Sequence, residues 1–306
     1  MLESFDTVTR QGGSIIGLFW IELAISALLL LLVVGVLAIA LVRFRAPAGD
    51  AHDPPQVHGN RRLEILWTVT PTLTLAVIFV LMVGTMRTVD AEQPSAEPLV
   101  IVGHQWWWEY SYPNHQTVAA NELHVPVGTP LQIRLQSVDV IHSFHVPQFG
   151  WMQDLIPGKT NTMSVLVERV GIYDGTCNQY CGLQHAWMRV RVVAEPANQF
   201  NAWAQQQAQP VVPSGAVGEQ VFQKNTCVAC HLVRGLNTPI ASVGPDLTHV
   251  GSRATLGAGV IDNTPDNLRS WLYNPQAIKP GVLMPAFQSL SPTDLSALVD
   301  YLESLK

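Results

Sequence analysis

Two long apolar segments at the N-terminal end are followed by shorter hydrophobic patterns over the rest of the chain. The first apolar segment runs from Ile15 to Val42 and the second from about Ile65 to Met86. A helix needs roughly 20 apolar residues to cross a bilayer, so both segments are long enough. Pro71 lies inside the second segment, and transmembrane helices tolerate proline better than soluble helices do. The pattern predicts a transmembrane helical hairpin within residues 1–98.

The distribution of arginine gives this hairpin an orientation. The loop between the two segments carries Arg43, Arg45, Arg61 and Arg62, whereas each outer flank carries a single arginine. Loops rich in arginine and lysine stay in the cytoplasm. We therefore expect both termini, and everything after the second segment, on the outer side of the membrane.

Residues 99–195 have the pattern of a small β-sandwich or barrel. Short alternating or β-branched segments are separated by turn residues; they are 99–102, 123–127, 131–135, 164–167 and 188–193. Several short strands at this spacing are typical of all-β domains.

The remainder changes character twice. Residues 196–213 contain proline and a glutamine run, which predicts a linker with one short helix at Gln199–Gln207. Residues 214–306 are predicted to be all-α with irregular loops. Ser291, followed by proline and by Asp294, marks a helix start, and leucines follow at helical intervals.

Composition agrees with a membrane protein and argues against a nucleic-acid-binding one. The 306 residues, enough for one to three domains, are 48% hydrophobic and 13% charged, with a formal net charge of −6. No block rich in lysine or arginine is present, so the chain lacks the basic patch that binds nucleic acid.

Two of the four cysteines lie in a cluster of metal-ligand types. Cys177, Cys181, His185 and Met188 follow one another closely, and His142 comes from a separate loop. Thiolates, imidazoles and a thioether together suit copper, whereas a thioether is a poor ligand for zinc. A disulfide between the two cysteines, with bystander histidines, is the alternative, since an extracytoplasmic location permits it.

A second thiolate changes the expected kind of copper site. One cysteine with two histidines and a weak methionine would bind a single copper ion. With Cys177 and Cys181 both present, two thiolates can bridge two copper ions, with one imidazole on each. Met188 and a backbone carbonyl would then occupy the weak positions.

The other two cysteines form the c-type haem attachment motif. Cys227 and Cys230 are separated by two residues and followed directly by His231, so the thiols would bind the porphyrin and the imidazole would bind iron. Met284, in a proline-containing loop, is the expected sixth ligand. His249 and an open iron site are the alternatives. A redox thiol pair would need a βαβ context, which is missing.

The N-terminal two thirds resemble subunit II of haem-copper cytochrome c oxidases. The matching segments are Glu64–Pro71, Gly103–Tyr110, Asp139–Phe144 and Cys177–Met188, within a resemblance that covers about residues 10–195. It implies a cupredoxin domain with a dinuclear CuA centre. The implied copper ligands are His142, Cys177, Cys181, His185, Met188 and the backbone carbonyl of Gln179.

The resemblance also has departures and further implications. The family usually has glutamate at position 179, so Gln179 puts a magnesium site at the interface with subunit I in doubt. His145 replaces a common aromatic residue, and we expect a packing role for it. The resemblance places Trp106 at the surface where electrons enter. It places Glu64 at the mouth of a proton channel into subunit I; a glutamate that reaches the membrane interface is the alternative.

Residues 214–306 resemble a class I cytochrome c, so the whole chain is similar to subunit II of a caa-type oxidase of the bacterial plasma membrane, with both redox domains periplasmic. The implied function is to pass electrons from a c haem to CuA and then to the haems of subunit I, where O2 is reduced with proton pumping. The implied partners are subunit I, subunit III, and a donor that is cytochrome c or a quinol–cytochrome c reductase. A nitric oxide reductase subunit and a copper delivery or storage protein are the alternatives.

Overall fold

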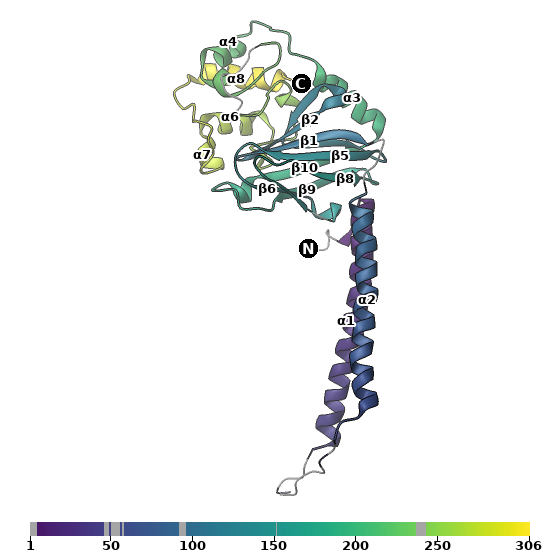
Figure 1. The fold of residues 1–306 in the computed structure, drawn as a ribbon. Helices are drawn as coiled ribbons and strands as arrows, with labels where there is room; N and C mark the ends of the chain where they lie inside the picture. The colour runs from purple at the N-terminus through teal and green to yellow at the C-terminus, as the bar shows by residue number, and fades with distance from the viewer. Residues whose placement is uncertain are drawn as a thin grey trace. The chain divides into compact units, whose positions relative to one another are not determined.

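The computed structural model describes residues 5–45, 49, 56, 58–91, 96–150, 152–236 and 243–306. Figure 1 shows their helices and strands. The chain forms two compact units: Gly13–Ala91, and Met1–Gly12 together with Glu92–Lys306.

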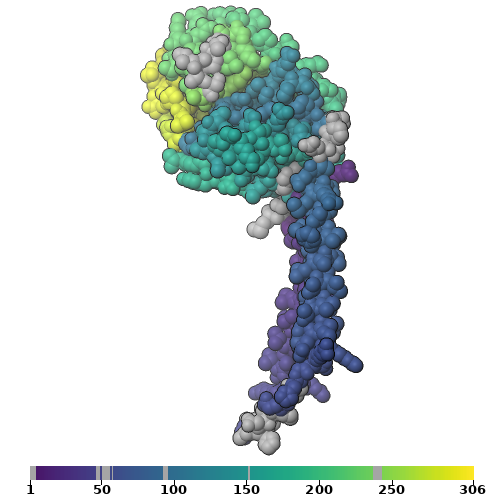
Figure 2. Space-filling view, in the orientation of Figure 1, coloured from purple at the N-terminus to yellow at the C-terminus, as the bar shows by residue number. Residues whose placement is uncertain are grey.

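The smaller unit holds the two long apolar helices, α1 (Arg10–Arg43) and α2 (Arg61–Val89). Both are long and apolar enough to cross a membrane, and the most apolar stretch of each helix is not covered by other parts of the protein. In Figure 2 the side chains of α2, in blue, project outward along the side of the helix that faces the viewer. The predicted pair of membrane-length helices is confirmed. Both helices extend beyond the apolar segments, because the polar flanking residues also join the helical hydrogen bonding.

The larger unit contains a sandwich of two five-stranded sheets. One sheet has the order β3-β2-β1-β5-β8 and the other β4-β10-β9-β6-β7. The strands are β1 (Glu97–His104), β2 (Trp107–Tyr112), β3 (Thr117–Ala120), β4 (Glu122–Pro126), β5 (Pro130–Ser137), β6 (His142–His145), β7 (Met152–Leu155), β8 (Asn161–Leu166), β9 (Gly171–Cys177) and β10 (Arg189–Glu195).

Alternating apolar residues explain why these strands form a sandwich. Leu99 and Ile101 in β1 are paired with Ile133 and Leu135 in β5, and all four side chains are buried between the sheets. Strands β1, β4, β5, β8 and β10 overlap the segments predicted from alternation. Five strands of the sandwich were not predicted: β2, β3, β6, β7 and β9. In β9, glycine and polar residues interrupt the apolar pattern.

A helix takes up most of the segment that was interpreted as a linker. Helix α3 (Ala197–Ala208) packs against the sandwich through Phe200 and Trp203, which contact Tyr112, and Trp203 also stacks on His124. The predicted short helix is therefore present, two residues longer at its start and one at its end. Phe200, Trp203 and Ala204 form an apolar stripe at helical spacing, and burial of that stripe fixes the helix.

Residues 209–216, which we call the tether segment, are hydrogen-bonded to the C-terminal region. The backbone N–H of Val211 donates to the carbonyl of Arg234 at 2.8 Å. The carboxylate of Glu219 accepts from the backbone N–H of Ser214 at 2.6 Å and from its hydroxyl at 2.9 Å. The tether segment is therefore held by specific contacts, which differs from the flexible linker that its composition suggested.

The C-terminal region is helical with one small hairpin. Its elements are α4 (Val217–Lys224), α5 (Cys227–Cys230), β11 (Thr255–Leu256), β12 (Ile261–Asp262), α6 (Pro265–Tyr273), α7 (Pro275–Ile278) and α8 (Pro292–Ser304). Ser291 caps α8 by accepting the backbone N–H of Asp294, as the sequence predicted. Phe222 from α4 and Leu298 and Leu302 from α8 are buried in one apolar core.

Candidate metal centre and haem site

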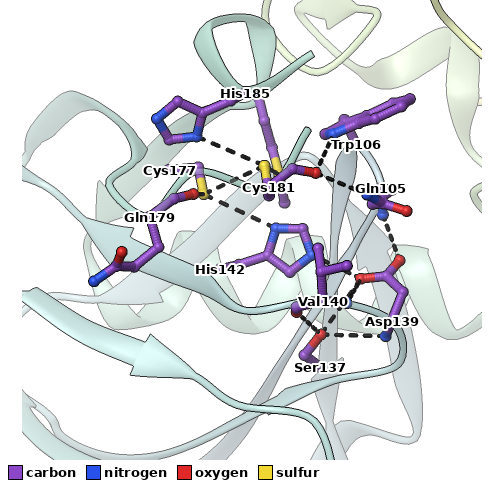
Figure 3. A network of polar contacts seen from close by, with 11 residues as sticks. Gln105, Trp106, Ser137, Asp139, Val140, His142, Cys177, Gln179, Cys181 and His185 are labelled. Carbon is purple, nitrogen blue, oxygen red and sulfur yellow. Dashed lines mark hydrogen bonds and ion pairs between the residues drawn. The ribbon is translucent and has the colours of Figure 1, made fainter. Parts of the chain in front are cut away.

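The copper-type side chains converge at one end of the sandwich (Figure 3). The ligand atoms of His142, Cys177 and Cys181 lie within 4.8 Å of one another, and all three residues are buried. Cys177 Sγ lies 3.9 Å from His142 Nδ1, and Cys181 Sγ lies 3.6 Å from His185 Nδ1. Each thiol therefore faces its own imidazole.

The two sulfurs are separated, and each has a weak ligand beside it. Cys177 Sγ and Cys181 Sγ lie 3.9 Å apart, whereas a disulfide would hold them at about 2.05 Å. The carbonyl oxygen of Gln179 lies 3.3 Å from Cys177 Sγ, and the thioether of Met188 lies 4.0 Å from Cys181 Sγ. The arrangement thus has two similar halves, each with one imidazole and one weak donor.

Backbone geometry brings these residues together. His142 begins β6 and Cys177 ends β9, two strands that are paired in the same sheet. We call residues 177–188 the copper loop; its ends are tied by a hydrogen bond from the N–H of Cys177 to the carbonyl of Met188 at 3.0 Å. Gly103 makes room for the histidine, because a Cβ there would lie 2.7 Å from His142 Cδ2.

A second layer of polar groups holds the site. His142 Nε2 lies 2.8 Å from Asp139 Oδ1, so the proton belongs on Nε2 and the lone pair of Nδ1 points at Cys177. Asp139 also accepts the backbone N–H of Gln105 at 2.7 Å. Sequence reasoning did not assign a role to Asp139 or Gln105. The spacing of Asp139, three residues before the histidine, was the available signal.

The turn between β1 and β2 also holds the copper loop in place. The Gln105 amide and the Trp106 indole N–H both donate to the carbonyl of Cys181, at 2.7 and 2.9 Å. Trp106, predicted as the residue where electrons enter, is therefore in direct contact with the copper loop. The peptide of Cys181 connects it to the sulfur that faces His185.

The protonation of the two thiols is coupled. The hydrogen bond with Cys181 is the main cause that lowers the pKa of Cys177 to about 4, and the same contact raises the pKa of Cys181. Burial lowers the pKa of His142, but its hydrogen bonds with Asp139 and Cys177 outweigh burial and raise it. One thiolate is thus available readily, and a bound cation would favour loss of the second proton.

Other predicted residues lie apart from the cluster. His145 is on β6, three residues after His142, so strand alternation turns it to the opposite face. The side chain of Gln179 is exposed. Glu64 lies in the first turn of α2, and the hydroxyl of Thr68 donates to its carbonyl at 2.8 Å.

The haem-attachment residues occupy a single helical turn and the residue after it. Cys227 and Cys230 begin and end α5, and burial raises the pKa of Cys227 to about 11. His231 Nδ1 donates a hydrogen bond to the backbone carbonyl of Pro245 at 2.8 Å. That bond places the lone pair on Nε2, the nitrogen that would bind iron. A Cβ on Gly244 would lie 2.5 Å from His231 Cε1, so glycine is required there.

The two candidates for the sixth iron ligand differ in their surroundings. Met284 lies in the loop between α7 and α8 and packs, partly buried, against the C-terminal apolar core. His249 is buried, and its Nε2 lies 3.0 Å from the carbonyl of Gln209 in the tether segment. His249 thus has a structural partner, which favours Met284 as the ligand.

Comparisons with known proteins cover the whole chain. Family models match at residues 8–83 (cytochrome c oxidase subunit II, transmembrane domain), 117–195 (cytochrome c oxidase subunit II, periplasmic domain) and 216–306 (cytochrome c). Cytochrome c oxidase subunit 2 of Alkalihalophilus pseudofirmus is 35% identical, over 100% of this chain and 91% of the relative. The chain belongs to the cytochrome c oxidase subunit II family.

Further relatives share the same name. Cytochrome c oxidase subunit 2 of Bacillus sp. strain PS3 is 32% identical over 86% of this chain and 80% of the relative. That of Bacillus subtilis is 30% identical over 87% and 81%. The resemblance inferred from sequence motifs is confirmed, as is the order of membrane hairpin, all-β domain and all-α cytochrome c domain.

Membership fixes the broad role of the chain. A cytochrome c oxidase subunit II is a membrane-anchored part of an oxidoreductase and works with other oxidase subunits. Its two domain types imply copper and haem as cofactors. A subunit that joins a cytochrome c domain to the copper domain fits the point where electrons enter a haem-copper oxidase.

Proposed function

We propose that this chain accepts electrons at a covalent c haem, passes them to a dinuclear CuA centre, and delivers them to the haems of subunit I, where O2 is reduced. The observation that carries the proposal is the pairing in the copper loop. Cys177 and Cys181 each face one imidazole and one weak donor. Two similar halves, each with a thiol, an imidazole and a weak donor, would suit a pair of copper ions.

The proposed copper ligands divide between the two halves of the site. The residues that would hold the copper are Cys177 and Cys181 through their thiolates, His142 and His185 through their imidazoles, Met188 through its thioether and Gln179 through its backbone carbonyl. Copper and haem would supply reversible one-electron transfer. The protein keeps the ligands in place through Asp139 and the Cys181 carbonyl contacts, so little rearrangement is needed when an electron arrives.

We propose that Cys227 and Cys230 would hold the haem covalently and that His231 and Met284 would bind its iron. The hydrogen bond to Pro245 orients the imidazole. Histidine and methionine together favour electron transfer over oxygen chemistry at the haem.

The orientation of the chain follows from its arginines. With Arg43 and Arg45 in the cytoplasm, both redox domains are proposed to lie on the periplasmic side. Trp106 is then proposed to lie on the path of electrons, supported by its contact with the copper loop. Glu64, at the start of α2, is proposed to face a proton channel of subunit I. Gln179 has no carboxylate, so a magnesium ion at that interface would need other ligands.

The partners we propose are subunits I and III, with cytochrome c or a quinol–cytochrome c reductase as the donor. The test is to measure copper, covalent haem and O2 uptake on the purified complex. We expect two copper ions and one c haem for each chain. His142→Gln should lose copper, whereas His145→Gln, on the same strand with its side chain on the opposite face, should keep it.

Two results would contradict the proposed function. Consumption of nitric oxide without O2 would assign the chain to a nitric oxide reductase. Rapid loss of copper to a chelator, without a near-infrared band from a mixed-valence copper pair, would favour copper delivery or storage. If removal of residues 214–306 left turnover with the native donor unchanged, the role of the cytochrome c domain would be wrong.

A further inference from the structure

A small hairpin of the cytochrome c domain projects onto the copper domain. Residues 254–262, which we call the docking hairpin, comprise β11, β12 and the turn between them. Gly257, Ala258 and Gly259 have φ angles of 64°, 62° and 81°. Alanine adopts this left-handed conformation only at an energetic cost, so the surroundings of the turn must hold it.

Glu122 of β4 binds the start of the docking hairpin. Its carboxylate accepts the backbone N–H of Ala254 at 3.1 Å, the backbone N–H of Thr255 at 2.9 Å, and the Thr255 hydroxyl at 3.0 Å. Glu122 is only 6% exposed. A buried carboxylate is costly unless it is hydrogen-bonded. The donors of all three hydrogen bonds lie in the cytochrome c domain.

The tip of the docking hairpin packs against Trp107 of the copper domain. Trp107, Ala120 and Ala258 form a small apolar cluster across the two domains. The carbonyl of Ala258 accepts the backbone N–H of Arg189 at 3.3 Å. The indole of Trp107 donates to the carbonyl of Val243 at 3.3 Å. Trp107 belongs to the matching segment Gly103–Tyr110, and this contact gives it a role distinct from that of Trp106.

Lys279 is a second buried charge at the same junction. It is 2% exposed, and its Nζ donates to the carbonyls of Gly257 at 2.8 Å and Trp106 at 3.3 Å. Lys279 thus connects the turn of the docking hairpin to the turn between β1 and β2, which contacts the copper loop. Burial lowers the pKa of Lys279 to about 8, with Cys181 as the nearby titratable group that opposes this shift.

These contacts bring the loops of the two proposed cofactors against each other. Lys279 begins the loop that carries Met284, and Arg189 directly follows the copper loop. A Cβ on Gly281 would lie 3.1 Å from Gln184 Nε2 and 3.6 Å from Leu183 Cβ, both in the copper loop. The docking hairpin therefore contacts a residue next to each redox loop, Lys279 and Arg189, where the two loops meet.

We propose that Glu122 and Lys279 are positioning residues that latch the docking hairpin to the copper domain and so hold the cytochrome c domain in its electron-transfer pose. The inference rests on the proposed function for its consequence, since the pose matters only if an electron crosses this junction. In that step the haem iron goes from ferrous to ferric as the oxidised CuA pair takes up the single electron. No proton or further reactant is needed.

The first measurement is hydrogen–deuterium exchange of the peptide covering residues 254–262 in the full, cofactor-loaded chain. Glu122→Gln keeps the shape of the side chain but turns an amide N–H toward a backbone donor. We expect at least about tenfold faster exchange, the effect of losing one charge-assisted hydrogen bond. Lys279→Met should act in the same direction, because it leaves the carbonyls of Gly257 and Trp106 without this donor.

Matched controls are exposed charges of the same types, Glu168→Gln in the copper domain and Lys224→Met in the cytochrome c domain. In both control variants, the backbone amides of residues 254–262 should exchange at the wild-type rate. Copper and haem content, measured on the same samples, separates a failure of the proposed cofactors from a failure of the latch.

The second measurement is the rate of haem-to-CuA electron transfer after rapid reduction of the haem. In Glu122→Gln we expect this rate to fall at least tenfold with unchanged copper and haem content. If one of the two variants leaves hydrogen–deuterium exchange of the hairpin at the wild-type rate, the substituted residue does not hold the docking hairpin. The proposal is overturned if both variants do so, or if residues 254–262 exchange in the wild type as fast as unprotected amides.

Discussion

Asp139→Asn should weaken copper binding while leaving the fold intact. The change replaces one oxygen by an NH2 group and removes a charge, with almost no change in volume. Asp139 lies outside the proposed ligand set, but its Oδ1 lies 2.8 Å from His142 Nε2. The variant therefore tests whether the second layer of the site, rather than the ligands alone, sets copper affinity.

The size of the effect follows from the hydrogen bonds of the carboxylate. Its two oxygens accept from His142 Nε2, from the backbone N–H of Gln105 at 2.7 Å, and from that of Val140 at 2.6 Å. Asparagine has only one acceptor oxygen, so its NH2 group faces one of these donors in either orientation. One charge-assisted bond is lost, worth about 1.5–3 kcal/mol. That corresponds to roughly a tenfold to 150-fold weaker affinity.

The assay is competition for copper between the full-length chain in detergent and a copper chelator, followed by near-infrared absorbance. Asp174→Asn is the matched control, because Asp174 is 72% exposed and lies 3.4 Å from Arg191 on the same domain. It should bind copper as the wild type does. Affinity of Asp139→Asn within twofold of the wild type, or an equal loss in the control, would refute the reasoning.

Three further predictions, tested with four variants, concern other parts of the molecule. Met284→Leu should convert the haem spectrum from low-spin to high-spin and lower its reduction potential, whereas His249→Gln should leave both unchanged, as absorbance and redox titration would show. Gly244→Ala should reduce covalent haem per chain, because a methyl group would lie 2.5 Å from His231 Cε1; pyridine haemochrome analysis measures it. Tyr112→Phe should destabilise the β-sandwich by about 1–3 kcal/mol in urea unfolding, because its buried hydroxyl makes two backbone hydrogen bonds.

The helices and strands that the sequence predicted are those determined by residues close together in the chain. The membrane-length helices follow from apolar length, and α8 follows from the Ser291 cap and the leucine spacing after it. Strands such as β5 follow from alternation of buried residues. By contrast, β9 has a glycine and an aspartate within it, and its pairing with β6 and β10 makes it a strand. Such pairing partners are far apart in sequence, so no local pattern contains them.

The candidate site divides in the same way. Spacing within the copper loop identified Cys177, Cys181, His185 and Met188, because metal-ligand types at short intervals are rare by chance. The residues that orient them were not found, since Gln105 acts through a backbone N–H and an amide group that many surface glutamines share. A side chain of common type gains such a role only from the fold around it.

Glu122 shows why the junction between the two domains could not be read from sequence. In β4 it alternates with Leu123, so it has the pattern of a solvent-facing residue, yet the docking hairpin buries it. The tether segment has eight residues, which span at most about 29 Å when fully extended. Tether length alone raises the local concentration of the cytochrome c domain without setting its orientation. Orientation requires directional contacts, and the three hydrogen bonds of Glu122 provide them. Fusion and latch therefore have separate effects: a variant with a longer tether should keep fast haem-to-CuA transfer as long as Glu122 is present.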